Sequence, residues 1–409
     1  MKKILLSLVI SGLAMSGYAN INGNGFYRVM NYGTSRWASL IDNQASVDAV
    51  GGSADLHALQ LSNNFEKMIT DPGSIVYLKN ISGSQYNVSA QGTTLSDLVN
   101  NPVSIKASSS VDGQSLYYIY GTYKGNVKYI GDNNSILRDE YGYASLNVTK
   151  TANKQWIFVP VDENTYNYYS VLPTVAANGK LYTANFTSFG YKPESSNVKA
   201  YYIARVYKGL AEIIEIKDAI VPPASPVIIE CAGNSTEDNK MILSVSSGAL
   251  PNNMLSGVYF NYYDKSFTNR VKYDANTMRV LGKCTDGSLG FITAKGLEYI
   301  PANTAYLKVA AGSPAEIKCV STEEFEAGVD SDPDPGENPG AGVYAVSSNT
   351  SDIIYKGTTV YCDGASEISV LNIAGQTMLK SNKGFIDIVN LPKGVYIATA
   401  GSKSIKIVR

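Results

Sequence analysis

The stretch "LYYIYGTYKGNVKYIG", residues 116–131, decides the fold class of this chain. Its apolar and polar positions alternate on both sides of a glycine turn, which is the pattern of a β-hairpin. The same pattern occurs in residues 25–40 and 73–88, and residues 156–171 are predicted to be a closing pair of strands. Recurrence about every forty to fifty residues indicates a barrel of repeated hairpin units.

Each of these units contains an aromatic strand, a turn, a second strand and a glycine, and in this the segment 20–165 resembles a β-trefoil of the ricin-B-like type. The family's Q-x-W signature corresponds here to Gln155-Trp156, without a spacer residue. The resemblance implies a trefoil-like barrel for the first domain. We also expect a short helix within it, near residues 55–70.

Aromatic residues beside turns are the strongest functional signal in this first domain. Trp37, Tyr86, Tyr129 and Trp156 lie near Asn and Asp residues. Aromatic rings next to polar groups can stack on sugar rings, so these four residues are predicted to bind a ligand. The alternative is that the same aromatic side chains fill the core of the barrel.

The middle domain, residues 166–325, contains an internal repeat. "VPPASPVIIECAG" (221–233) and "IPANTAYLKVAAG" (300–312) have the same succession of an aliphatic residue, proline, a small polar turn, an alternating strand and glycine. Two copies of one hairpin predict a β-sandwich. The stretches 197–213 and 278–292 also resemble a domain common in secreted proteins of the Bacteroidetes, which implies no particular chemistry.

Residues 326–343 are rich in Pro, Asp and Gly and contain almost no apolar residue, so they are predicted to be a linker. Residues 344–409 then alternate in the manner of a small β-sandwich. Gly375-Gln376, "LPKGVY" at 391–396 and a basic last strand at 403–409 resemble the C-terminal sorting domain of the type IX secretion system. That resemblance implies secretion machinery as a partner of the tail.

The turn "LPKG" within this tail is expected to need Pro392 for its fixed φ and Gly394 for a positive φ. The predicted fold class is therefore all-β: a trefoil-like domain, a β-sandwich middle domain and a small C-terminal β-sandwich.

The N-terminus predicts export from the cytoplasm. Lys2 and Lys3 precede an apolar run, and small residues at 17 and 19 follow it, as in a signal peptide covering residues 1–19. The apolar run is too short for a membrane span, and no later run is long enough. The net charge of −1, without basic clusters, argues against nucleic acid as a partner. With 30 Tyr against 10 Phe and 2 Trp, the composition favours strands with half-wet surfaces.

Cysteine and histidine usage restricts the chemistry that we expect. Cys231, Cys284, Cys319 and Cys362 show no C-x-x-C spacing, so no zinc site is predicted. The three cysteines of the middle domain cannot all pair with one another, so we expect thiols without a disulfide framework, and a single bridge stays open as the alternative. His57 is the single histidine, and no G-x-S-x-G motif accompanies it. We therefore predict no metal, no cofactor and no catalytic residue.

The sequence as a whole predicts a secreted or outer-membrane surface protein that binds or adheres and is not an enzyme. A carbohydrate is one expected partner, and a host or matrix surface is the other. Two alternatives remain open. One is a purely structural surface protein, and the other is a glycan-processing enzyme that uses paired carboxylates such as Asp139-Glu140, Asp162-Glu163 or Glu323-Glu324.

Overall fold

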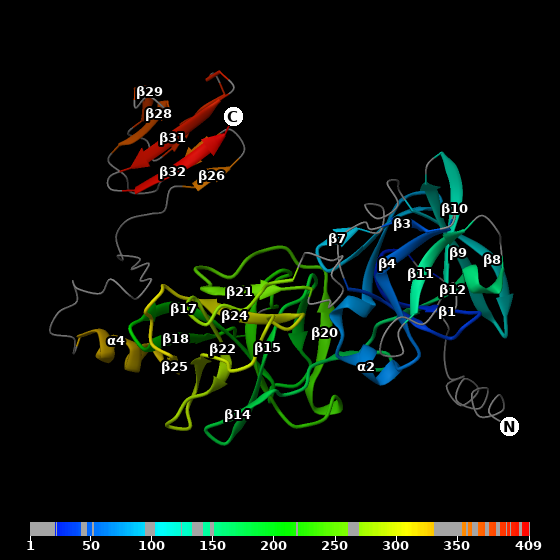
Figure 1. The fold of residues 1–409 in the computed structure, drawn as a ribbon, viewed down its shortest axis with the longest axis horizontal. Helices are drawn as coiled ribbons and strands as arrows, with labels where there is room; N and C mark the ends of the chain where they lie inside the picture. The colour runs from blue at the N-terminus through cyan, green and yellow to red at the C-terminus, as the bar shows by residue number, and fades with distance from the viewer. Residues whose placement is uncertain are drawn as a thin grey trace. The chain divides into compact units, whose positions relative to one another are not determined.

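The fold is all-β, as the sequence predicts, and the chain divides into two compact units, Met1–Val343 and Tyr344–Arg409 (Figure 1). The structure is a computed structural model. It describes residues 21, 23–41, 47–50, 53–94, 103–123, 125–132, 142–147, 151–217, 220–260, 270–330, 354–356, 359–361, 367–372, 376–381, 385–389, 391–392, 394–400 and 403–408. The predicted signal peptide and most of the predicted linker lie outside these residues.

One sheet contains the first twelve strands. Their bounds are β1 (Gly25–Asn31), β2 (Trp37–Leu40), β3 (Val47–Val50), β4 (Ser53–Ser62), β5 (Ile75–Ser82), β6 (Gln85–Ala90), β7 (Thr93–Thr94), β8 (Val103–Val111), β9 (Gln114–Tyr123), β10 (Asn126–Asp132), β11 (Gly142–Asn147) and β12 (Gln155–Pro160). Six of them pair in a closed antiparallel ring, β1-β12-β9-β8-β6-β5, because β5 pairs again with β1. The hairpin strands β2, β4, β11 and β10 close a second path from β1 to β9. The trefoil assignment of this barrel stays a prediction.

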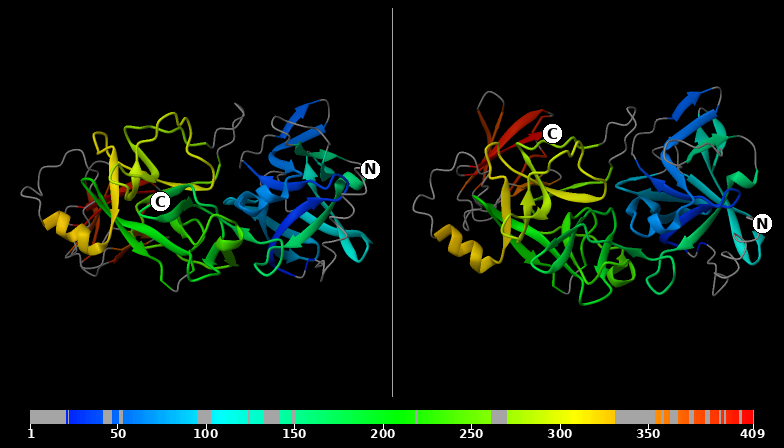
Figure 2. Two further views of the ribbon diagram at one scale, coloured as in Figure 1. Left: turned by 90° about the horizontal axis from the view of Figure 1, so that it is seen from below. Right: turned by 60° about the horizontal axis from the view of Figure 1, so that its bottom comes forward.

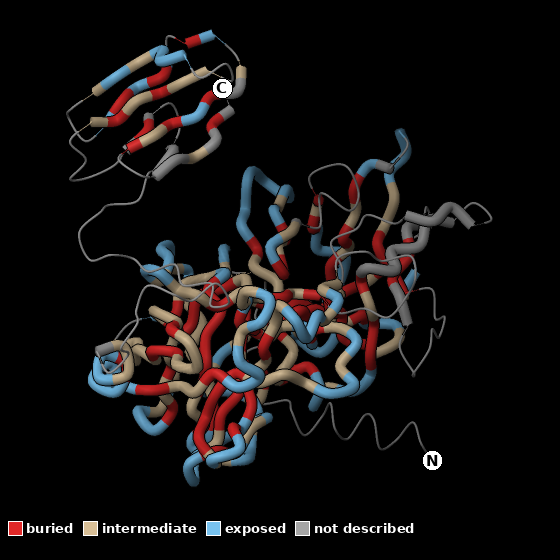
Figure 3. Tube along the Cα trace, turned by 60° about the vertical axis from the view of Figure 1, so that its left-hand side comes forward, coloured by how far each residue is buried: buried red, intermediate tan, exposed pale blue. Residues whose placement is uncertain are grey.

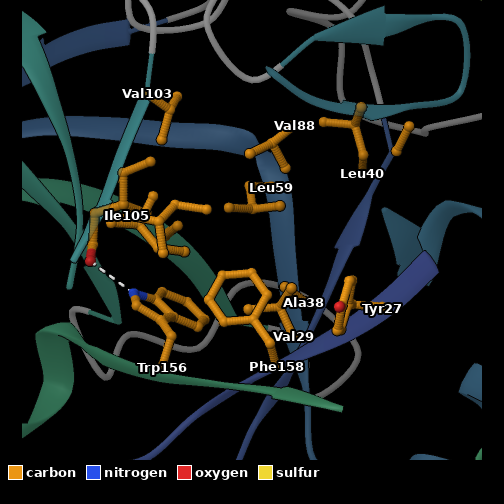
Figure 4. Close-up of a cluster of buried hydrophobic side chains, with 14 of the residues drawn as sticks. Tyr27, Val29, Ala38, Leu40, Leu59, Val88, Val103, Ile105, Trp156 and Phe158 are labelled. Carbon is orange, nitrogen blue, oxygen red and sulfur yellow. Dashed lines mark hydrogen bonds between the residues drawn. The ribbon is translucent and has the colours of Figure 1, made fainter. Parts of the chain in front are cut away.

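Alternation along each strand fills the barrel interior. Tyr27 and Val29 on β1 and Trp156 and Phe158 on β12 point into one buried cluster, and Figure 4 shows them together with side chains from the other strands. The intervening residue Ile157 packs instead into a second cluster outside the ring. A period of two therefore sends neighbouring residues to opposite faces, as a half-buried strand requires.

The segment predicted as a short helix at 55–70 is mostly strand. Strand β4 occupies Ser53–Ser62, and the helix α2 covers only Phe65–Ile69. The helix begins where the side chain of Asn64 accepts a hydrogen bond from the backbone nitrogen of Lys67, three residues later, which is an N-cap. His57 consequently lies on a strand, and its side chain is outside the described part of the chain.

The middle domain contains two sheets of different size. The larger has the order β14-β15-β19-β17-β18-β25-β23-β22-β24-β21, in which only β18 and β25 run parallel, and the smaller has the order β13-β20-β16. The bounds are β13 (Tyr169–Ser170), β14 (Val175–Ala177), β15 (Lys180–Asn185), β16 (Gly190–Pro193), β17 (Lys199–Tyr207), β18 (Leu210–Glu215), β19 (Val227–Cys231), β20 (Lys240–Ser244), β21 (Leu255–Val258), β22 (Met278–Lys283), β23 (Leu289–Ile292), β24 (Thr304–Lys308) and β25 (Glu316–Val320). Figure 3 shows the buried strands inside this first unit and the exposed turns around them.

Among the described residues of the first unit, short helical turns occur at three places: η1 (Pro72–Ser74), η3 (Ala152–Lys154) and η4 (Glu237–Asn239). Each one stands directly before a strand, so these turns redirect the chain into the sheets.

The sequence repeat of the middle domain is also a repeat of backbone conformation. Val221 and Ile300 begin the two copies, and both side chains are fully buried. Three residues later, Ala224 and Asn303 take positive φ angles of 55° and 57°. Non-glycine residues rarely adopt this conformation, and each turn here leads into the strand that its sequence copy predicts.

The barrel and the middle domain share buried side chains within the first unit. Ile75 of the barrel belongs to a cluster formed by strands of the middle domain, and Phe260 of the middle domain belongs to the barrel core. Phe26 also meets Phe189 edge-on, with ring centroids 5.8 Å apart. The two further views in Figure 2 likewise place the strands coloured blue to cyan beside the green ones.

Helix α4, Thr322–Asp330, ends the described part of the first unit. Five residues that were predicted to start the linker, 326–330, are therefore helical. Arg205 explains this difference, because its guanidinium bonds Glu326 at 2.6 Å and lies 4.6 Å from the ring of Phe325. The apolar signal is small in the sequence, since only Phe325 and Val329 of this helix pack against the cluster with Tyr207 and Val320.

The second unit is a small two-sheet domain. Its bounds are β26 (Ile354–Lys356), β27 (Thr359–Tyr361), β28 (Ile368–Asn372), β29 (Thr377–Ser381), β30 (Phe385–Asp387), β31 (Val395–Ala400) and β32 (Lys403–Val408). They pair as β26-β27-β30 and as β29-β28-β31-β32. The alternating residues of these strands meet in one buried cluster, so the tail has its own core.

The "LPKGVY" turn of the tail is built from side-chain contacts. Leu391 is buried in the tail core, and the hydroxyl of Tyr396 donates to the carbonyl of Pro392 at 2.8 Å. The expectation of a positive φ at Gly394 is wrong, because Gly394 is absent from the residues with that conformation. A Cβ atom there would meet the Tyr396 ring at 3.7 Å, an ordinary contact, so the turn is held by Tyr396 and not by glycine strain.

Candidate functional site

The two predicted tryptophans lie in the interior. Trp156 is 1% exposed, and its indole donates a 2.8 Å hydrogen bond to the carbonyl of Ile130, drawn as the dashed line in Figure 4. Trp37 is 8% exposed and packs outside the ring, where its side chain meets Phe65 with centroids 4.7 Å apart. Both indoles therefore fill cores, which is the alternative that accompanied their predicted ligand contact.

The two predicted tyrosines differ from each other. Tyr86 stands opposite the buried Val103 and packs, half-buried, against the barrel core. Tyr129 lies on β10 next to the inward-pointing Ile130 and so faces away from the core. The structure thus brings none of the four predicted residues together in one site, and only Tyr129 reaches the outer surface of the barrel.

Tyr129 is part of a cluster of three tyrosine rings on that outer surface, which we call the tyrosine surface (Tyr118, Tyr120 and Tyr129). Tyr129 pairs across the strands with Tyr120, and their ring centroids are 5.4 Å apart. Tyr118 meets Tyr129 edge-on at 5.5 Å. All three side chains are half-buried, so each ring has one side against the barrel and another toward solvent.

Polar residues border the tyrosine surface because neighbouring strands bring them into the same rows. Tyr120 stands opposite Ser104, which stands opposite Gln85, and Tyr118 stands opposite Lys106 and Gln155. Opposite residues of paired strands point to the same face. The rings are therefore surrounded by hydroxyl, amide and ammonium groups.

One of these polar neighbours is held in place. The Gln155 amide donates to the hydroxyls of Ser108 and Ser109 at 3.0 and 3.1 Å. Both donors of the amide are thereby directed at the protein, which leaves its oxygen as the group available for an outside donor.

The carboxylate pairs considered for glycan hydrolysis occupy structural positions where the structure describes them. Asp162 accepts from the backbone and side chain of Asn164 in a turn. Glu324 accepts from the backbone nitrogen of Ser321 at the start of α4. Asp139-Glu140 lies outside the described residues. Within the described ranges, no group of three or more His, Cys, Asp and Glu residues is placed to hold a metal ion.

Three cysteines of the middle domain carry free thiols: Cys231, Cys284 and Cys319. Burial raises the pKa of the Cys231 thiol to about 12 and raises that of Cys319 well above its ordinary value. Protonated thiols are poor nucleophiles and poor metal ligands, so these cysteines serve packing.

Sequence reasoning missed Tyr118 and Tyr120, although their signal is present in "LYYIYG". Alternation about the buried Ile119 places both tyrosines on the face opposite to it. The pairing of this strand with β10 could not be read from the sequence, and it is this pairing that adds Tyr129 to the same face.

The described residues contain no helix that is long and apolar enough to cross a bilayer. No protein-family model matches the chain, and no curated protein matches it in sequence.

Proposed function

We propose that this chain is a secreted or surface-associated protein that binds glycan without catalysis, and that the tyrosine surface is its glycan contact. The observation that carries the proposal is the cluster of three half-buried tyrosine rings on the outer face of β9 and β10. The exposed side of these rings adds nothing to the packing of the barrel, whereas a ligand that stacks on them would remove that exposed area from water.

Glycan fits this surface better than a charged or purely apolar partner does. The C–H faces of a sugar ring pack against aromatic rings, and its hydroxyls need neutral donors and acceptors nearby. Ser104, Gln85 and Gln155 supply such groups beside the rings. The three rings lie on a sheet surface, so they favour an extended chain of sugars that contacts several of them.

The tail supports the location in this proposal. It forms a compact unit of its own, and Tyr396 fixes the hexamer that resembles the sorting domain. We propose that the second unit directs the chain past the outer membrane and that the first unit binds.

Binding of the mature chain to a panel of soluble polysaccharides, measured by affinity electrophoresis, tests the proposal. Tyr120→Ala and Tyr129→Ala should each weaken binding by about 1–2 kcal/mol, roughly 5- to 30-fold, as truncated contact residues do. Tyr202→Ala is the matched control, since Tyr202 is a half-buried tyrosine on the middle domain. Equal binding by all three variants would contradict the proposal.

Two other outcomes would select the alternatives. The chain could bind no glycan of the panel and instead bind cells or matrix protein. If Tyr129→Ala abolishes that binding, the tyrosine surface is assigned to protein adhesion. Release of reducing sugar from a polysaccharide by the purified chain would establish a hydrolase.

A further inference from the structure

A cavity of about 150 Å³ lies between the barrel and the middle domain. Phe26, Tyr77 and Ser89 line it from the barrel, and Phe189 and Ser246 are among the residues that line it from the middle domain. It is half-open to solvent, and none of the residues that line it belongs to the tyrosine surface.

The walls of the cavity are aromatic and hydroxylated but carry no charge. The ring centroid of Phe26 lies 5.1 Å from that of Tyr77 and 5.8 Å from that of Phe189, so the three rings pack together along the cavity. Every other described residue that lines the cavity is Ser, Gly, Ala, Ile, Val or Pro. A charged ligand would lose its hydration here without gaining an ion partner, so the lining selects a neutral one.

One polar atom of the lining has no partner among the residues that the structure describes. The Oγ atom of Ser246 is buried and makes no hydrogen bond among the described residues. The backbone at Gly190 approaches it so closely that a Cβ atom there would lie 2.3 Å from this oxygen. A buried hydroxyl without a partner costs about 1–3 kcal/mol, and a turn of the Ser246 side chain toward the cavity that it lines would let an outside group satisfy it.

We propose that this cavity binds one neutral sugar ring, as a free monosaccharide or as the end of a glycan, with a ligand hydroxyl bonded to Ser246. The volume corresponds to roughly five water molecules, which is enough for one six-membered ring whose edge projects through the open mouth. In this arrangement the aromatic rings contact the C–H faces of the sugar, and the serine hydroxyls contact the hydroxyl groups at its edge. The proposal does not rest on the tyrosine surface.

Saturation-transfer NMR of the mature chain with glucose, galactose, mannose and N-acetylglucosamine tests this site, with glucuronate and glucosamine as charged counterparts. At least one neutral sugar should bind, and neither charged sugar should bind comparably. Matched oligosaccharides that carry the binding sugar at their non-reducing end show whether the ligand is a free monosaccharide or the end of a glycan. Equal or stronger binding of the oligosaccharide identifies the glycan end as the ligand, and weaker binding identifies the monosaccharide.

Ser246→Ala is the decisive variant, because it removes only the unpartnered hydroxyl. It should weaken binding about tenfold, the value of one hydrogen bond, while the melting temperature stays the same or rises. Ser247→Ala, at the exposed neighbour outside the cavity, should change neither. Ser89→Phe should fill the cavity and abolish binding, and its melting curve will report whether it is folded.

The proposal is overturned if no neutral sugar binds, or if Ser246→Ala binds as tightly as the unchanged chain. Tyr120→Ala separates the two sites: it should leave monosaccharide binding intact while polysaccharide binding falls. Loss of monosaccharide binding in that variant would move the ligand to the tyrosine surface and refute the cavity.

Discussion

Removal of the Arg28 guanidinium should destabilise the first unit more than any surface substitution does. Arg28 is fully buried on β1. Its Nε donates to Ser74 at 2.8 Å, and one Nη donates to both the Asn167 side chain and the carbonyl of Tyr168 at 2.7 and 2.8 Å. The other Nη donates to the carbonyl of Met68 at 2.7 Å. One side chain thus ties the barrel to the end of α2 and to the connection that enters the middle domain.

The magnitude follows from two opposing terms. Arg28→Met leaves five buried acceptors without their donor, because Arg28 also donates to the carbonyl of Ile69, and loss of one member of a buried charged network costs about 3–5 kcal/mol. Burial lowers the pKa of Arg28 to about 10, so the folded protein already bears a cost for this charge that methionine removes. We expect a net loss of about 3 kcal/mol, which is about 4–5 °C in melting temperature for a unit of this size.

The loss should also depend on pH through Asp71. Burial raises the pKa of Asp71, while the charge of Arg28 lowers it. An acid whose pKa is raised by folding loses stability as pH rises through the interval above its ordinary value of 3.8. Without Arg28 that interval widens, so Arg28→Met should lose more stability at pH 7 than at pH 4.

Differential scanning calorimetry of the mature chain measures both effects. Lys79→Met, at an exposed residue of β5, is the control and should stay within about 0.5 kcal/mol. A loss below about 1 kcal/mol for Arg28→Met, or a loss that is greatest at pH 4, would refute the reasoning.

Three further predictions concern the rest of the chain. Limited proteolysis should cut first between residues 330 and 342, and a stable fragment that spans this stretch would contradict the linker. In a Cys362→Ser variant at pH 8, the thiols of Cys231 and Cys319 should stay unreactive toward a disulfide reagent, because burial raises their pKa, and should react after denaturation without reductant. If the denatured protein shows fewer reactive thiols than it has cysteines, a disulfide is present. A melting temperature that falls when reductant is added would show the same. Deletion of residues 344–409 should leave a folded first unit in the periplasm, and surface display of the truncated chain would refute the sorting role.

Much of the fold could be predicted from local patterns in the sequence. The repeated "VPPASP" and "IPANTA" stretches differ in most positions, yet Ala224 and Asn303 share one rare φ. In both copies a buried aliphatic residue followed by proline leads into the residue with positive φ, so the conformation of the turn is determined locally. The short helix expected at 55–70 occupies only residues 65–69 for the opposite reason, since residues 53–62 become a strand only through pairing with β2 and β11.

The candidate sites depend on pairings that the sequence does not reveal. The sequence pattern around an aromatic residue does not show whether its side chain points into a barrel or out of it. Trp156 points inward and Tyr129 outward, although both are aromatic residues of a strand. The cavity is less accessible still to sequence reasoning. Phe26 and Phe189 are 163 positions apart and meet only because two domains pack together.

The two repeated turns give that packing a physical cause. Pro223 of the first copy lines the cavity against the barrel, and Asn303 of the second accepts a 2.5 Å hydrogen bond from the amide of Gln91. Gln91 itself has a positive φ, and its backbone nitrogen bonds Ser188 at 2.9 Å. Both copies of the repeated turn therefore face the barrel. Gln91, the barrel residue that bonds Asn303, has a positive φ like Ala224 and Asn303 themselves.

Strained residues persist only where their surroundings hold them. The junction between the domains therefore behaves as one structural element and not as a loose contact. The two buried side-chain polar atoms without a partner among the described residues, in Gln91 and Ser246, both lie there. A ligand that enters the cavity touches both domains, so its binding energy adds to the energy that keeps them together. Sugar binding should consequently raise the melting temperature of the whole first unit, and binding that stabilises only one of the two domains would place the ligand elsewhere.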